Sequence, residues 1–282
     1  MTQTTKATSN SLPSSGSQLI TVAKYEFRNY FGSRRFYVLL AIALIVSALL
    51  TYVVAVRRPA SFLDNSLDFY SSWWGRIAGL MAILSGIFFG GDAISSEFQN
   101  RTGYFLVPNP IRRSSIYVGK WISAFVAAVI ILAITLAITL ANAFYYFGPT
   151  IPSQLLQSIV FSLIYLASVM GLTFMFSSLF KSSSYSILVS AILYLFVFSL
   201  VEDLVSSIVQ IEPWFIPTYG ASIITNVMTV PFPAHVITTT FGRNITLTTY
   251  NATIPEGLAI LLGYCVISAI LGLVLFEKKD FT

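Results

Sequence analysis

The chain has 282 residues, of which 56% are hydrophobic and only 10% are charged. Soluble domains contain about 25% charged residues, so this composition, with a mean hydropathy of +0.78, excludes a soluble globular protein and indicates an integral membrane protein. A net charge of +5 would suggest nucleic acid or another acidic partner in a soluble protein. In a membrane protein it reports orientation instead, so we expect membrane lipid and no nucleic acid as a partner.

The first predicted element follows a polar, Ser/Thr-rich leader (1–16) that we expect to be disordered and that has no cleavable signal peptide. Residues 17–35 have helical periodicity, with Lys24 and Arg28 beside an apolar face that Glu26 interrupts at one border. This pattern predicts an amphipathic helix in the membrane interface. A frayed extension of the first span is the alternative. The apolar face consists of Leu19, Ile20, Ala23, Phe27, Tyr30 and Phe31.

Six apolar runs follow, each long enough to cross a hydrocarbon core about 30 Å thick at about 1.5 Å per residue. The uncharged block 121–180 contains two of them, because the Gly and two Pro residues of "FGPTIPSQ" end helices. The sequence therefore predicts an all-α polytopic membrane protein whose six-span domain covers 36–282, with a loop at about 206–253. The predicted spans are 36–56, about 74–96, the two parts of 121–180 divided at 147–154, 182–201 and 257–276.

A further uncharged stretch, 213–234, contains four prolines. Its proline-free part, 218–230, would be about 20 Å long as a helix, which is too short to span. We expect an interfacial or re-entrant helix there, and a seventh spanning helix is the alternative.

Span two carries a stripe of small residues. At about 100° per residue these residues fall on one face about 80° wide, which favours a close helix–helix contact in lipid. Glycine is costly in a helix, so the pattern suggests a packing role, although glycine is also frequent in membrane helices generally. The stripe consists of Gly75, Gly79, Ala82, Gly86, Gly90 and Ala93.

The segment 95–120 between spans two and three is charged and contains two prolines. Glu97 and Arg101 have helical-pair spacing, Gly103 suits a helix end, and Asn109–Pro110 suits the start of the next helix. We expect an elbow of two helices joined by an apolar tip at 104–107. It could be a docking surface or an anchor whose tip touches lipid. The residues expected to keep the second helix's start out of the bilayer are Arg112, Arg113 and Lys120.

This elbow resembles the corresponding motif of ABC-2 type transporter permeases, and the resemblance extends over about 17–282. The matching positions are Glu97, Thr102, Gly103, Leu106, Pro110, Arg113, Gly119 and Lys120. The resemblance implies an ATP-driven exporter in which the elbow is the coupling helix. It also implies a second permease subunit and a separate ATP-binding subunit that carries ATP and Mg²⁺. The sequence agrees, because it has no G-x-x-x-x-G-K-[ST] phosphate loop and no cofactor is expected on this chain. Coupling residues would also include Arg101 and Arg112.

Orientation follows from the basic residues. Of the 16 Lys and Arg residues, all but Arg57, Arg58, Arg76 and Arg243 lie at the two termini, in the elbow or at Lys181. This bias predicts a plasma-membrane protein with both termini and the elbow in the cytoplasm. The sequons at Asn244 and Asn251 would then face outside and their glycosylation stays open, while Asn100 also matches a sequon on the cytoplasmic side.

Two other classes of function are less well supported. A secondary transporter or channel usually needs ionisable groups within the membrane, and Asp92, near the end of span two, is better explained as a locally paired carboxylate. Intrinsic catalysis lacks a suitable constellation, since His235 lies in a proline-rich loop and Cys265 lies within a span. We therefore predict no catalytic or metal residues. The low charge of the spans suggests a hydrophobic or amphipathic substrate.

Overall fold

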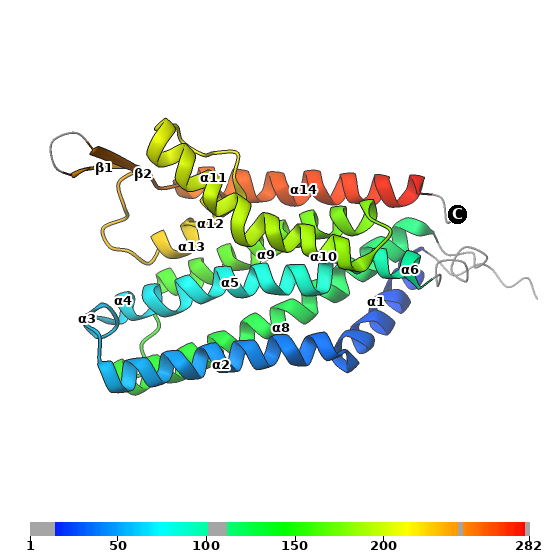
Figure 1. The fold of residues 1–282 in the computed structure, drawn as a ribbon. Coiled ribbons are helices and arrows are strands. Elements are labelled where there is room, and N and C mark those ends of the chain that lie inside the picture. Colours follow the sequence, from blue (N-terminus) through cyan, green and yellow to red (C-terminus); the bar gives the residue numbers. More distant parts are fainter. Residues whose placement is uncertain (1–14, 101–111, 242–244, 280–282) are drawn as a thin grey trace, which may run out of the picture.

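The computed structural model describes residues 15–100, 112–241 and 245–279, so most of the predicted leader lies outside the described residues. The fold is an all-α polytopic membrane bundle, and the described residues form six helices long and apolar enough to cross a membrane, which confirms the predicted class and number of spans. The helices run side by side (Figure 1). We name the two ends of the bundle by what lies there: the elbow end, where residues 100 and 112 lie, and the hairpin end, beside a β-hairpin.

The spans are longer than the apolar runs that predicted them. Four spans are single α-helices, and two contain π-helical segments. Span three begins at Arg113, eight residues before its predicted apolar run, so it extends beyond that run at the elbow end. In chain order the spans are α2 (Arg34–Arg57); α4 (Ser66–Tyr70), η1 (Ser71–Gly75), α5 (Arg76–Ser85), η2 (Gly86–Gly90) and α6 (Ser95–Gln99); α8 (Arg113–Phe147); α9 (Ser153–Leu179); α10 (Ser183–Ile192), η3 (Leu193–Val197), α11 (Phe198–Leu204) and η4 (Val205–Val209); and α14 (Ile254–Lys278). The short α3 (Ala60–Leu63) precedes α4.

The predicted amphipathic helix corresponds to α1 (Ser15–Gly32), a helix separate from span one. Ser33 has an extended backbone between them, and its Oγ accepts a hydrogen bond from the backbone N of Phe36 at 3.3 Å. This N-cap starts a new helix, so the alternative of a continuous extension is wrong. The face of α1 also covers α8, because a Cβ built on Gly119 would lie 2.9 Å from Val22 Cγ1. Ile20, assigned to the apolar face, is 66% exposed.

The core of the bundle is formed by span two and α9. In the most apolar 18-residue stretch of span two, 72% of the residues are buried, and in that of α9, 61% are buried. In the corresponding stretches of span five and α14, only 17% of the residues are buried. Span five and α14 therefore expose apolar side chains on the outside of the bundle, as helices that face lipid or a partner subunit do.

Small residues of span two allow it to approach α9. A Cβ on Gly86 would lie 2.4 Å from Val169 Cγ1, and one on Gly90 would lie 2.2 Å from Thr173 Oγ1. Both distances are shorter than real Cβ contacts, so these two glycines permit the contact. Gly75 makes a similar approach near the hairpin end, at 2.9 Å from Thr225 Oγ1.

The remaining members of the predicted stripe do not all share this role. Ala82 and Ala93 are buried, but a Cβ on Gly79 would meet nothing within 4 Å among the described residues. Two π-segments, 71–75 and 86–90, interrupt the span. A π-turn holds more residues than an α-turn. Residues on the two sides of a π-segment are therefore no longer related by about 100° per residue, which is the angle that placed the stripe on one face.

The stretch 213–234 contains two short helices, α12 (Pro217–Ala221) and α13 (Ile223–Asn226), so the alternative of a seventh spanning helix is wrong. The helices enter the bundle at the hairpin end. Tyr219 and Ile224 are each 1% exposed. The Ser158 hydroxyl on α9 donates to the carbonyl of Ile224 at 2.6 Å. The two short helices are therefore held within the protein at this end of the bundle.

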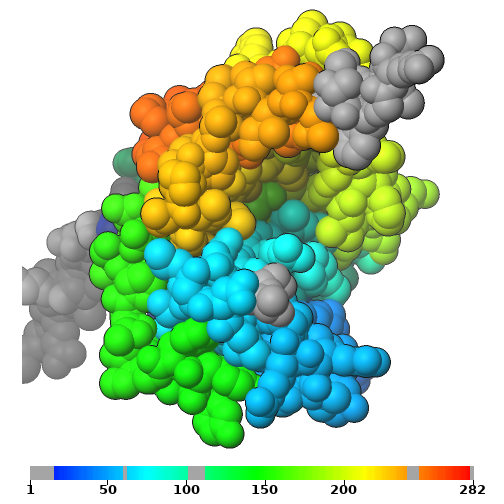
Figure 2. Space-filling model, turned by 90° about the vertical axis from the view of Figure 1, so that its left-hand side faces the viewer, coloured from blue at the N-terminus to red at the C-terminus, as the bar shows by residue number. Residues whose placement is uncertain are grey.

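The same loop forms a feature that the sequence analysis missed, an antiparallel hairpin of β1 (Val236–Phe241) and β2 (Ile245–Tyr250). The signal was present, since β-branched and aromatic residues on both sides of a glycine-containing turn favour a hairpin. The hairpin projects beyond the helices (Figure 1). Figure 2 looks onto this end, where the orange segment that precedes α14 lies across from the cyan residues of α3 and α4.

Candidate functional site

The elbow end is the candidate site, and its described part consists of the segments that flank the predicted tip. Glu97 lies on α6, while Arg112, Arg113 and Lys120 lie at or in α8. The other residues assigned to coupling lie outside the described residues: Arg101, Thr102, Gly103, Leu106 and Pro110.

Two predicted helix boundaries are wrong. The helix expected to stop at Gly103 ends at Gln99, because Asn100 has φ −87° and ψ 0°, outside the helical region. The next helix was expected to start at Pro110 but starts at Arg113. Arg112 has φ −68° and ψ 134°, and such an extended residue cannot continue a helix from Pro110 into α8.

Span two is also interrupted before it reaches the elbow. A turn separates η2 from α6, although a continuous helix was predicted. The backbone N–H groups of Ile94 and Ser95, which the turn leaves without helical partners, each donate to Ser177 Oγ on α9 at 2.9 Å. A broken helix is tolerated in a membrane protein when neighbouring helices satisfy its backbone in this way.

Lys120 joins three helices. Its ammonium is 2.7 Å from Glu26 Oε1 on α1 and 2.8 Å from Glu97 Oε1 on α6. The Lys120 side chain is 6% exposed, and the two carboxylates are 13% and 16% exposed. Lys120, which the sequence predicted to keep the start of this helix out of the bilayer, is a buried cation between two acids. Glu26 interrupts the border of the apolar face of α1, and the structure gives the reason: its carboxylate pairs with Lys120.

A second ion pair lies beside the triad of Glu26, Lys120 and Glu97. Arg35, at the start of α2, pairs with Asp92, whose side chain is 9% exposed, in the turn after η2. The predicted local pairing of Asp92 is therefore confirmed.

The two sets of charges line one cavity of about 690 Å³ between α1, α6 and α8. Tyr30 closes a side of it, and its hydroxyl donates to the carbonyl of Phe89 at 3.2 Å. Burial, with the nearby Glu26 carboxylate, raises the pKa of Tyr30, so the hydroxyl keeps its proton.

Short contacts also tie α6 to the corner between spans four and five. Gln99 Oε1 accepts a hydrogen bond from the backbone N of Ser183, the first residue of α10, at 2.8 Å. Together with Ser177, this contact attaches α6 to α9 and α10. A displacement of α6 would therefore act directly on α8, α9 and α10, and through Lys120 on α1.

The elbow end also holds the C-termini of α9 and α14. Arg113 donates from Nη1 to the carbonyls of Glu277 and Lys279 at 2.9 and 3.0 Å, at the end of α14. The Lys279 ammonium donates to the carbonyls of Ser178 and Phe180 at 2.8 and 2.9 Å, at the end of α9. Burial, with the nearby Lys181 charge, lowers the pKa of Lys279 to about 8. At neutral pH the group remains mostly charged, and cations at helix C-termini are favourable.

At the opposite end, Asn251 lies at the base of the hairpin, and its side-chain amide donates to the carbonyl of Ala234 at 2.9 Å. Asn244 lies outside the described residues.

Six apolar helices with buried ion pairs beside α6 and α8 have the architecture of a polytopic membrane protein. Residues 20–281 match the family described as ABC-2 family transporter protein, and the chain belongs to this family. None of the curated proteins matches the chain. The family match confirms the resemblance found in the sequence and covers nearly the same residues, since that resemblance extended over about 17–282.

Proposed function

We propose that this chain is the permease subunit of an ATP-driven exporter. ATP and Mg²⁺ are bound and ATP is hydrolysed by a separate ATP-binding subunit, which docks at the elbow end, and a second permease subunit completes the transporter. The observation that carries the proposal is the Glu26–Lys120–Glu97 triad, because it links α1, α6 and α8 at the base of the elbow. The family to which the chain belongs supports the same function.

In this proposal the elbow end faces the cytoplasm of the cell, as the positions of the basic residues suggest. Movement of the docked subunit displaces α6. The triad passes this displacement to α1 and α8, while Ser177 and Gln99 pass it to α9 and α10. In this scheme the elbow carries out no chemical reaction itself. It shifts packed helices between discrete arrangements, as in other rigid-body switches.

The cargo we propose is hydrophobic or amphipathic, such as a lipid, a peptide or a drug-like molecule. The apolar composition of the spans supports this class, since a strongly charged solute would need compensating charges along its pathway. The candidate charges of the elbow end are already paired with one another, as Arg35 is with Asp92.

The triad allows a test that separates stability from coupling. Lys120→Met leaves two buried carboxylates facing each other, so we expect a loss of about 3–5 kcal/mol in stability. The triple variant Glu26→Gln/Glu97→Gln/Lys120→Met removes all three charges, so it should recover much of that stability. It should still lower substrate-stimulated ATP hydrolysis by about tenfold, because the contacts that link the helices are lost.

The measurement uses the tagged chain isolated from native membranes with the subunits that accompany it, and then reconstituted in lipid vesicles. We expect an ATP-binding subunit to co-purify and to hydrolyse ATP. Arg58→Gln, at the far end of α2, serves as a control that removes a charge away from the elbow. Normal ATP-driven transport by the triple variant would contradict the coupling role of the triad, and transport that needs no ATPase subunit would contradict the proposed function itself.

A further inference from the structure

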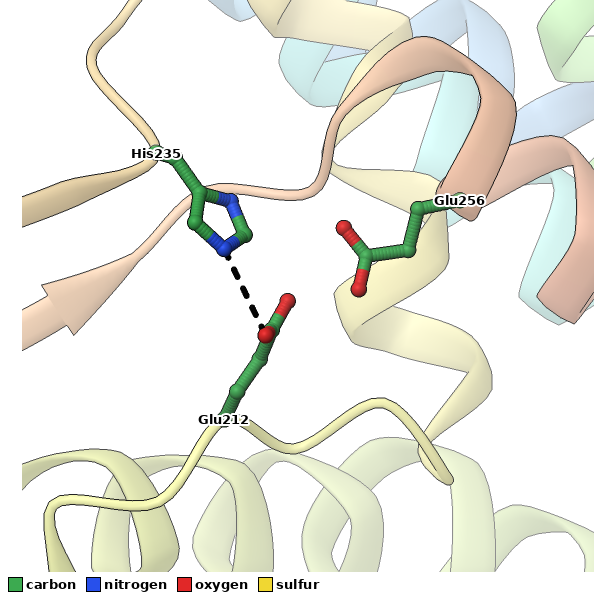
Figure 3. Close-up of side chains that lie close together, drawn as sticks. All are labelled: Glu212, His235 and Glu256. Atoms are coloured by element: carbon green, nitrogen blue, oxygen red, sulfur yellow. Dashed lines mark ion pairs between the residues drawn. The ribbon is translucent and has the colours of Figure 1, made fainter.

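We propose that the hairpin end contains a binding site for a divalent transition-metal ion, with Zn²⁺ the best suited, formed by Glu212, His235 and Glu256. Each offers one ligand atom, and these atoms lie within 4.8 Å of one another. Figure 3 shows the three side chains pointing toward a common point. They come from the loop after η4, the residue before β1 and the first turn of α14, so only the folded chain brings them together.

The histidine is oriented as a metal ligand. His235 Nδ1 lies 2.9 Å from the carbonyl oxygen of Asn251. A carbonyl only accepts, so Nδ1 carries the proton, and in the neutral ring Nε2 carries the lone pair. Metal-bound histidines characteristically donate their other N–H to such a group. Nε2 faces the Glu212 carboxylate, with 3.4 Å between Nε2 and Oε2.

That 3.4 Å separation fits a shared metal ion. Two ligands at about 2.0–2.1 Å from a tetrahedral Zn²⁺ lie about 3.3 Å apart. Without a cation, a neutral Nε2 lone pair and a carboxylate oxygen repel each other, and so do the two carboxylates. A divalent ion resolves both repulsions at once, because two carboxylates and one neutral imidazole balance its charge.

Each carboxylate is held on one side by a partner outside the cluster, and its other oxygen faces the cluster. Glu212 accepts a hydrogen bond from the Tyr219 hydroxyl through Oε1, which leaves Oε2 toward His235. Glu256 accepts from the backbone N of Thr253 at 3.2 Å through Oε2, as part of a capping box, which leaves Oε1. Ligands fixed by partners outside the site need little reorganisation to bind an ion.

The backbone around His235 is fixed as well. The Asn251 backbone N donates to the carbonyl of His235 at 2.8 Å, which closes the base of the hairpin. The Tyr250 hydroxyl donates to the carbonyl of Gln210 at 2.6 Å, which ties β2 to the loop that carries Glu212. The side chain of His235 remains 42% exposed, so an ion can enter from solvent.

Three protein ligands and an open fourth position for water make a zinc site of the N/O type. A hard ion such as Mg²⁺ or Ca²⁺ prefers oxygen ligands and is a poorer match to imidazole. The bound ion would connect the end of span five, the hairpin and the start of α14. Its effect is therefore structural: it would hold the hairpin end in one arrangement.

The test uses the full chain, purified in detergent and stripped with a chelator, and titrated with Zn²⁺ at neutral pH. We expect one Zn²⁺ per chain with micromolar or tighter affinity. Saturating Zn²⁺ should raise the thermal unfolding midpoint by about 5 °C or more, and EDTA should reverse the shift. Co²⁺ in place of Zn²⁺ should give the visible absorption of a tetrahedral site.

Two variants identify the ligands. His235→Ala and Glu212→Gln should each weaken Zn²⁺ binding by about 100-fold. Glu212→Gln keeps an acceptor for Tyr219, so it changes the ligand while preserving that contact. Asp203→Asn, which removes an exposed acid on α11, is the matched control and should bind Zn²⁺ as the unmodified chain does.

The proposal is overturned if the unmodified chain binds no Zn²⁺ at micromolar concentration, which would mean that protons alone hold the cluster together. It is also overturned if both variants bind Zn²⁺ normally, because the ion would then lie elsewhere. Should His235→Ala fail to fold, Glu212→Gln and the Co²⁺ spectrum of the unmodified chain still decide between these outcomes.

Discussion

Gly86 and Gly79 belong to the same sequence pattern but differ in what surrounds them. A Cβ on Gly86 would lie 2.4 Å from Val169 Cγ1, whereas one on Gly79 would meet nothing within 4 Å among the described residues. Val169 is β-branched, and in a helix its side chain has one strongly preferred rotamer. It cannot turn away cheaply, so Gly86 is required for the contact between span two and α9, and Gly79 is not.

Alanine substitution should therefore have opposite effects at these two positions. Gly79→Ala gains helix propensity without a clash and should be neutral or stabilising by up to about 1 kcal/mol. Gly86→Ala has the same gain but must displace Val169 and should destabilise by about 1–3 kcal/mol. Thermal unfolding of the two variants in detergent measures the difference.

Val169→Ala provides the check on this explanation. Combined with Gly86→Ala, it removes the methyl group that the new Cβ would strike, so the double variant should be more stable than the sum of the single changes predicts. If Gly79→Ala and Gly86→Ala are equally mild and additive with Val169→Ala, the close contact does not limit packing and the explanation is wrong.

Lys120 shows where sequence reasoning at the residue scale stops. The sequence identified Lys120 as a charged residue at the start of an apolar span. Together with Arg112 and Arg113, it was expected to keep the start of that helix out of the bilayer. Its partners, Glu26 and Glu97, lie on two other helices. Nothing in a single sequence states which helices meet, so the buried triad was not predictable, although an acid on an otherwise apolar helix face could have prompted a search for a buried cation.

At the scale of elements, the end of α14 depends on a residue of α8. Arg113 donates to the carbonyls of Glu277 and Lys279, which are among the carbonyls that a helix end leaves without intrahelical partners. Arg113→Ala should therefore fray the last turn of α14, at a cost of about 1 kcal/mol. Hydrogen–deuterium exchange should accelerate in the peptide that contains residues 274–279, and little elsewhere in α14.

Lys278→Ala is the control for this prediction, since Lys278 is exposed and lies in the same turn. It removes a charge that favours the helix end electrostatically but leaves the Arg113 hydrogen bonds to Glu277 and Lys279 in place. Equal protection in both variants would show that the Arg113 contacts do not hold the end of α14. The role of Arg113 would then rest on the elbow alone.

The sequence predicted the membrane spans well, because the length and apolarity of a run of residues are enough to identify a span. All six spans were found from runs such as 36–56, because the thickness of the hydrocarbon core fixes how many apolar residues are needed. The features that were missed depend on what lies beside each segment. The break before α6 is satisfied because Ser177 accepts from the backbone N–H groups of Ile94 and Ser95. The helices α12 and α13 are buried because they pack against α14 and α9.

At the scale of the whole molecule, clusters of charged side chains are found at both ends of the bundle, while the middle of the spans is mainly apolar. The elbow end holds the Lys120 triad, and the hairpin end holds the cluster around His235. The proposed function requires the elbow end to face the compartment that contains ATP, and it places the hairpin on the opposite side of the membrane. The orientation of the bundle therefore tests the function as a whole.

Single cysteines can report this orientation when Cys265 is first replaced by serine. Asn100 and Thr249 are suitable positions, since both are exposed and lie at opposite ends. Thr249 is a better choice than Asn251, whose amide holds the base of the hairpin. In intact cells, Thr249→Cys should react with a membrane-impermeant thiol reagent, and Asn100→Cys should react only after the membrane is permeabilised. Labelling in the reverse order would place the elbow outside the cell, where no ATP-binding subunit could drive it, and the proposed exporter mechanism would then be untenable.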